Sequence, residues 1–146
     1  MSILAKNKRA YFDYNIIEKY EAGVVLAGHE VKSIKLGHIS LQGSYVTIKD
    51  NEAFLFNAHI TPYQPANMPK DYNPTRTRKL LLKKSEIKTF IGNSKIQGLT
   101  ILPLSVYNKK GKIKIEIGLA RSKKKYEKRE AIRKRDVERE VGVRLR

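Results

Sequence analysis

The sequence predicts a mainly β fold, a small antiparallel barrel with peripheral helices, followed by a basic C-terminal tail. Three observations predict it: apolar and polar residues alternate along several short segments, turn-forming residues separate these segments, and the composition changes near residue 121. Residues 1–120 hold 19 basic and 9 acidic residues and show the alternating pattern of a buried core. Residues 121–146 hold 12 basic and 5 acidic residues and show no such pattern. We therefore expect a barrel domain over 1–120, beginning with a flexible basic N-terminal arm, and a tail over 121–146.

The clearest strand pair lies at the end of the barrel domain. Isoleucine and leucine occupy alternate positions over 113–119, and leucine or valine does so over 102–106. This period of two predicts strands with one buried face. The segment 108–111 between them ends in a glycine that can adopt a positive φ, which predicts a hairpin.

Two further segments are predicted to be β. A second hairpin spans 43–60, with strands over 44–49 and 52–60 and a turn at Asp50 and Asn51. Residues 14–26 are rich in Ile, Tyr and Val and form another predicted strand. Gly23 interrupts it, so we expect a bulge or a bend there.

Two helices and a long loop complete the predicted domain. The first helix covers 29–36 and ends at Gly37, and the second begins at Ser85 as N-cap and runs toward Ile96. Between the second hairpin and this helix, four prolines mark a loop over 61–75. Long loops in compact domains are usually functional or mobile.

The charge of the chain predicts its kind of partner. Thirty-one basic residues against 14 acidic ones give a formal net charge of +17. Such a charge weakens the compact state by self-repulsion, and a nucleic acid would offset this by counterion release. A solvated basic surface with no dedicated partner is the alternative. The chain has no cysteine, and neither a signal peptide nor a membrane helix is predicted, so we expect a cytoplasmic protein without a membrane partner.

The motifs of enzymes are missing from the sequence. The three histidines have no metal-ligand spacing, and the glycines form no phosphate-binding loop. Glu18, Glu21 and Glu30 could be imagined as a nuclease metal cluster, but no DxD or ExK arrangement supports it. We therefore predict no catalytic residue, no metal site and no cofactor.

Basic residues gather in four clusters, at 6–9, 32–35, 76–79 and 123–125. Each alone is typical of a solvated face, but four on a barrel of this size indicate a surface that follows phosphates in more than one direction. The sequence patterns of single-strand RNA readers are absent. Recognition of a folded RNA by its shape is therefore expected.

Read in order, these segments resemble the SsrA-binding protein (small protein B) family, the bacterial partners of transfer-messenger RNA. Glu-Val-Lys-Ser at 30–33 and Arg-Lys-Leu-Leu-Leu at 78–82 are the most specific matches. The resemblance covers essentially the whole chain, and its other stretches are 7–10, 20–23, 28–29, 43–46, 52–55, 74–77, 119–121 and 123–125.

The resemblance implies an OB-like (oligonucleotide-binding) β-barrel that binds the tRNA-like domain of transfer-messenger RNA. It implies that the protein takes the place of the missing anticodon arm and delivers this RNA to stalled ribosomes for trans-translation rescue. Positions in the family's RNA face match Asn7, Glu21 and Leu81. Together with the basic clusters, the predicted RNA-binding residues are Asn7, Lys8, Arg9, Glu21, Lys32, Ser33, Arg76, Arg78, Lys79 and Leu81.

The family's tail enters the small ribosomal subunit near the decoding centre and the mRNA channel. We expect the tail to be disordered alone and helical on the ribosome, and the protein to be a monomer. Many relatives carry His at the position of Phe12, and Phe can stack but cannot donate a hydrogen bond. The predicted ribosome-binding residues are Lys123, Lys124, Lys125, Lys128, Arg129, Arg133, Lys134 and Arg135.

Two other classes of protein remain as alternatives. A structural ribosomal protein that binds ribosomal RNA would share the charge and the barrel, but it would copurify with ribosomes that are not stalled. An RNA-processing nuclease would need a metal-binding acid cluster. We rank the ribosomal protein second and the nuclease third.

Overall fold

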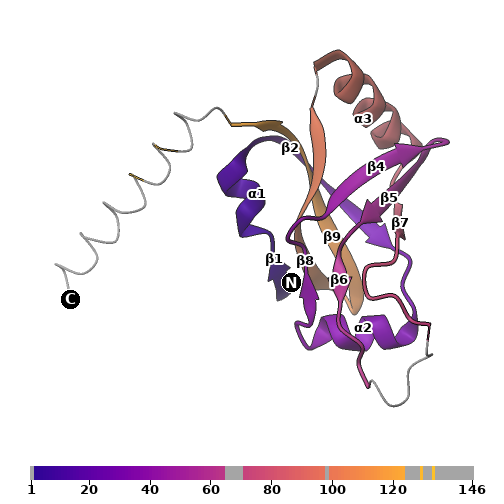
Figure 1. Cartoon of the computed structure of the whole chain (residues 1–146). Helices are drawn as coiled ribbons and strands as arrows, with labels where there is room; N and C mark the ends of the chain where they lie inside the picture. The colour runs from indigo at the N-terminus through magenta and orange to yellow at the C-terminus, as the bar shows by residue number, and fades with distance from the viewer. Residues whose placement is uncertain (1, 65–70, 98, 124–128, 130–132, 134–146) are drawn as a thin grey trace.

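The computed structural model describes residues 2–64, 71–97, 99–123, 129 and 133 (Figure 1). Its elements, in chain order, are β1 (Ser2–Lys6), α1 (Lys8–Asp13), β2 (Tyr14–Val24), α2 (Gly28–Lys35), β3 (Ile39–Ser40), β4 (Tyr45–Lys49), β5 (Glu52–Phe56), β6 (His59–Ile60), β7 (Arg78–Leu81), α3 (Lys84–Gln97), β8 (Thr100–Lys109) and β9 (Lys112–Ser122). No helix among the described residues is long and apolar enough to cross a membrane.

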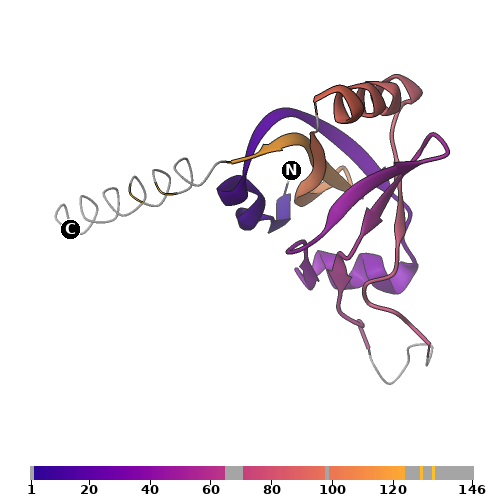
Figure 2. The ribbon, with the colours of Figure 1, turned by 45° about the horizontal axis from the view of Figure 1, so that its top comes forward.

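The main sheet is antiparallel and closes into a ring. Its strand order is β1-β8-β4-β5-β7-β2-β9. An additional pairing of β8 with β9 closes the ring. Strands β3 and β6 form a separate two-stranded sheet. Helices α1, α2 and α3 lie outside the ring, with α3 and α2 at opposite ends of it (Figures 1 and 2). The predicted mainly β fold with peripheral helices is confirmed.

In the β8–β9 hairpin, β9 follows the predicted alternation, whereas for β8 the prediction is wrong, because every residue from Ile101 to Tyr107 is buried. Every second residue of 113–119 is buried, and the two strands pair from Thr100 opposite Ala120 to Lys109 opposite Lys112. Lys110 and Gly111 take φ values of 51° and 79°, as a two-residue hairpin turn requires. Close packing also requires a glycine at position 118 of this hairpin, because a Cβ there would lie 2.7 Å from Cδ1 of Leu104.

The other predicted hairpin is shorter than expected. Strands β4 and β5 pair around Asp50 and Asn51, whose φ values are 52° and 61°. Its second strand ends at Phe56, because Asn57 adopts a φ of 64° and turns the chain. Residues 59–60 then pair with β3, not with β4.

Of the two features expected at Gly23, a bulge or a bend, the bulge is wrong, because the register shift in β2 lies between Ile16 and Glu18. Gly23 marks instead the point where β2 exchanges partners, since it pairs with both Lys114 of β9 and Leu81 of β7. A Cβ at this position would lie 3.3 Å from Cβ of Leu81, so a glycine lets the two strands approach.

The expected flexible N-terminal arm is also wrong. Residues 2–6 form β1, which pairs with the second half of β8, and residues 8–13 form α1. The N-terminal basic cluster is therefore held on the ring. In α3, Ser85 is not the cap: the helix begins at Lys84, and the Glu86 carboxylate accepts a hydrogen bond from the backbone N–H of Lys83 at 3.1 Å.

Candidate nucleic-acid interface

Glu21 lies on the outer face of β2 and is held by two residues of β8. The Tyr107 hydroxyl donates a hydrogen bond to its Oε2 at 2.5 Å, and Lys109 Nζ lies 3.3 Å from Oε1 and 3.2 Å from Oε2. The hydrogen bond from Tyr107, followed by the contact with Lys109, outweighs partial burial and lowers the pKa of the Glu21 carboxyl. The group is ionised at neutral pH and still 38% exposed.

Two open hollows flank this carboxylate, and Glu21 lines both of them. One has a volume of about 560 Å³ and is bordered by four lysines and by Leu81. The other has a volume of about 510 Å³ and is lined by three further lysines and by Tyr11. The lysines of the two hollows are Lys79, Lys83, Lys84, Lys114, Lys6, Lys19 and Lys109.

Two more of the predicted RNA-binding residues, Lys79 and Leu81, lie on strand β7 and line the larger of these hollows together with Glu21. Leu81 stands opposite Gly23 in the β2–β7 register and its side chain is 53% exposed, as an apolar contact surface beside lysines. Lys79 Nζ lies 3.0 Å from Oε1 of Glu52, with both side chains close to half exposed. Such surface pairs contribute little to stability, so Lys79 can exchange this partner for a phosphate. The fold thus brings Glu21, Lys79 and Leu81 together.

Arg78, predicted to contact phosphate, is instead buried. Its guanidinium donates to Glu30 Oε2 from Nη2 at 2.6 Å and from Nε at 3.0 Å, and to the carbonyls of Ala58 and Pro74. Ser33 is buried too, and its Oγ donates to the Thr61 carbonyl at 2.5 Å. Neither side chain offers a surface to RNA, which corrects the interpretation of these two residues.

Glu30 is the centre of this buried cluster. Arg76, whose side chain is 36% exposed, forms a second ion pair with it, and the backbone N–H of Ala27 donates to it at 3.0 Å. Burial alone would raise the pKa of the Glu30 carboxyl, but the hydrogen bonds from Arg76, Ala27 and Arg78 lower it to about 2. Sequence reasoning missed the cluster; the position of Glu30 in the first turn of a predicted helix was the available signal.

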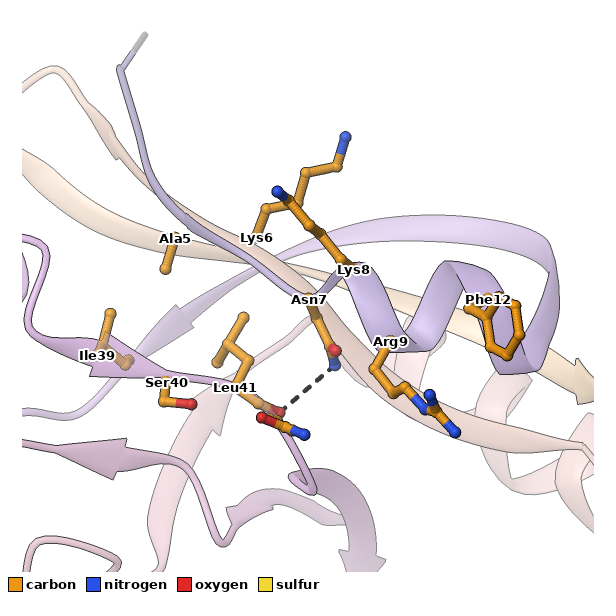
Figure 3. Close-up of a pocket in the computed structure, with 10 residues that line it drawn as sticks. Ala5, Lys6, Asn7, Lys8, Arg9, Phe12, Ile39, Ser40 and Leu41 are labelled. Carbon is orange, nitrogen blue, oxygen red and sulfur yellow. Dashed lines mark hydrogen bonds between the residues drawn. The ribbon is translucent and has the colours of Figure 1, made fainter. Parts of the chain in front are cut away.

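Asn7 is a structural residue of α1. Its side chain is buried, its Oδ1 accepts from the Ala10 N–H at 3.2 Å as an N-cap, and its Nδ2 donates to the Pro103 carbonyl at 2.9 Å. Figure 3 also shows its longer hydrogen bond to the Leu41 carbonyl, at 3.5 Å. Asn7 therefore fixes the helix start from which the next two residues project.

Lys8 and Arg9, the two residues after Asn7, are exposed and line a hollow of about 460 Å³ beside α1 (Figure 3). Arg9 Nε lies 2.8 Å from Oδ2 of Asp13, and its guanidinium lies 5.1 Å from the centroid of the Phe12 ring. The cation is thus held over an aromatic face, a geometry that can also receive a base.

Lys32 stands apart from these two surfaces. It is exposed on α2, with Nζ 5.7 Å from the centroid of the Tyr63 ring. Helix α2 lies at the opposite end of the ring from α3, which follows the Leu81 strand (Figures 1 and 2). The predicted RNA-binding residues that remain accessible therefore occupy several faces.

Three of the eight predicted tail residues are described. The backbone N–H of Lys123 donates to the Asp13 carbonyl at 2.9 Å, and its Nζ donates to the Tyr11 carbonyl at 3.2 Å, so α1 holds the first of them. Arg129 and Arg133 are exposed. The other five lie outside the described residues, namely Lys124, Lys125, Lys128, Lys134 and Arg135.

The ring of strands, with lysine-lined hollows around an ionised acid, defines a small RNA-binding protein with an OB-like fold. The chain belongs to the SmpB family: the sequence model of the SmpB protein matches residues 4–146. It is 54% identical to the SsrA-binding protein of Sulfurihydrogenibium sp., over 95% of this chain and 91% of the relative. It is also 54% identical to the SsrA-binding protein of Persephonella marina, over 97% and 93% of the two chains.

A solved structure supports the same assignment. The chain superposes on a protein in the structure reported as "tmRNA-SmpB: a journey to the center of the bacterial ribosome", with a TM-score of 0.69 and 42% sequence identity. The match covers 88% of this chain and 94% of that one. Among the described residues, no group of three or more His, Cys, Asp or Glu side chains could hold a metal ion.

Proposed function

We propose that this protein binds the tRNA-like domain of transfer-messenger RNA and delivers it to stalled ribosomes for trans-translation, in place of an anticodon arm. The membership of the SmpB family over residues 4–146 carries the proposal. The relatives at 54% identity are SsrA-binding proteins, and the matched solved structure concerns tmRNA and SmpB in the ribosome. The protein acts as an RNA-binding adaptor in the cytoplasm and catalyses no reaction itself.

The charge and shape of the surface support this role. The formal charge of +17 favours a polyanion through counterion release. The cations of β7, of α1 and of the start of α3 surround hollows, as expected for a protein that follows the backbone of a folded RNA. The proposed RNA-contacting residues of the body are Lys8, Arg9, Glu21, Lys32, Arg76, Lys79 and Leu81.

The tail has a separate proposed role in the small ribosomal subunit. Residues 121–146 hold 12 basic residues, enough to follow ribosomal RNA near the decoding centre and the mRNA channel. Near the start of this segment, Lys123 donates hydrogen bonds to the carbonyls of Tyr11 and Asp13, so the segment leaves the ring beside α1.

A reconstituted rescue reaction tests the proposal. Ribosomes stalled on an mRNA without a stop codon, supplied with charged transfer-messenger RNA, should add the tag peptide only when this protein is present. Equal tagging without the protein would contradict the proposed function. Stoichiometric copurification with ribosomes that are not stalled would favour a structural ribosomal protein instead.

A further inference from the structure

Glu21 has an unfavourable neighbour in the sheet. Its partner directly opposite in the β2–β9 register is Glu116, a second acid. Like charges at directly opposed positions destabilise a pair of strands. An acid that breaks a local rule at an exposed position points to a functional requirement.

The two residues that hold Glu21 differ in what they provide. The side chain of Lys109 is 46% exposed and has a long flexible stem, so it supplies charge without a fixed direction. Tyr107 is only 5% exposed, and a packed ring has a fixed rotamer. Its hydroxyl therefore aims a hydrogen bond at Oε2 of Glu21 from a constant position, across the intervening strand β9.

This hydrogen bond leaves part of the carboxylate free. Each carboxylate oxygen can accept two hydrogen bonds, and Oε1 of Glu21 has only the 3.3 Å contact with Lys109 in the described structure. The side chain lies between two lysine-lined hollows, where a polyanion would be drawn. A carboxylate repels phosphate, so its partner in RNA must be a hydrogen-bond donor of a base or a ribose.

We infer that Tyr107 is a positioning residue for RNA recognition, which holds the Glu21 carboxylate in the orientation that accepts a hydrogen bond from the RNA. This inference rests on the proposed function, because it assigns Tyr107 a part in binding the tRNA-like domain. The preorganised acceptor spares the complex the cost of ordering a free glutamate side chain on binding.

A double-mutant cycle in the full chain tests the inference, with affinity for the tRNA-like domain as readout. Tyr107→Phe keeps the packed ring and removes only the hydroxyl, so we expect binding roughly three- to tenfold weaker, the effect of about one hydrogen bond. The variant with both Tyr107→Phe and Glu21→Ala should bind no more weakly than Glu21→Ala alone. The salt dependence should keep the wild-type slope in Tyr107→Phe, since no cation is lost.

Tyr45→Phe is the matched control, because that ring is 41% exposed and stacks on Phe56 away from Glu21, at 5.4 Å between centroids. It should bind as the wild type does. Wild-type affinity for Tyr107→Phe would overturn the inference, and so would a loss that adds in full to that of Glu21→Ala, since that would reveal a structural role. A wild-type protein that failed to bind the tRNA-like domain would overturn the proposed function itself.

Discussion

The guanidinium of Arg78 and the carboxylate of Glu30 form an ion pair, with Nη2 2.6 Å from Oε2 and neither side chain exposed to solvent. The pair joins the first turn of α2 to the start of β7, 48 residues later in the chain. Each buried charge depends on the other, because a lone charge in the interior loses its hydration without compensation. Arg78 therefore stabilises the strand that presents Lys79 and Leu81.

Arg78→Met should lower the free energy of unfolding by about 3–5 kcal/mol, because it leaves the buried Glu30 carboxylate with Arg76 as its one charged partner among the described residues. Urea denaturation measures the change. The neighbouring Lys79→Met is the matched control and should cost less than about 0.5 kcal/mol, since Lys79 is exposed. Equal losses in the two variants would contradict the buried role of Arg78.

The stability should depend on pH through Glu30. Its folded-state pKa of about 2 lies below the ordinary 4.5, so its contribution is complete above the ordinary value. That contribution is lost as the pH falls from about 5 toward 2, because the unfolded chain binds the proton first. Unfolding curves across this range should show a steeper acid loss for the wild type than for Glu30→Gln. Parallel curves would show that another carboxyl dominates.

The strands were predictable where burial on one face imposes alternation, as at Ile113, Ile115 and Ile117. Asp50 and Asn51 were predictable because few residues tolerate a positive φ. The burial of Arg78 could not be predicted, because a run of basic residues such as 76–79 is typical of an exposed surface. Only the fold shows that the Glu30 carboxylate reaches it from α2.

The candidate site was also only partly predictable from the sequence. Lys79 could be nominated by charge, but neither composition nor period indicates that Glu21 and Leu81 share a face. Gly23 brings them together by pairing with strands on both of its sides. Asn7 was assigned through the resemblance, and its buried position makes it a helix cap that supports Lys8 and Arg9.

Lys79→Ala and Leu81→Ala should weaken RNA binding in different ways. Removal of the lysine should reduce the slope of log affinity against log salt by about one unit or less, for one lost phosphate contact. Removal of the leucine should lower affinity at every salt concentration without changing the slope. Titrations at several salt concentrations separate the two. Lys88→Ala, at an exposed lysine of α3, is the control and should match the wild type.

Truncation after Lys123 should separate the body from the tail. Strand β9 runs to Ser122 and Lys123 contacts α1, so this cut leaves the ring intact. The truncated protein should bind the tRNA-like domain with wild-type affinity and should fail to support tagging on stalled ribosomes. An equal loss of RNA binding would show that the tail also holds the RNA.

A binding titration at physiological salt tests most directly whether the body recognises a particular folded RNA. The tRNA-like domain of transfer-messenger RNA and an unrelated hairpin of equal length should be compared with the same protein preparation. We expect tight binding of the tRNA-like domain, a steep loss of affinity with salt, and at least about tenfold weaker binding of the hairpin. Equal affinity for the two RNAs would contradict specific recognition and would leave only the nonspecific attraction of a charge of +17.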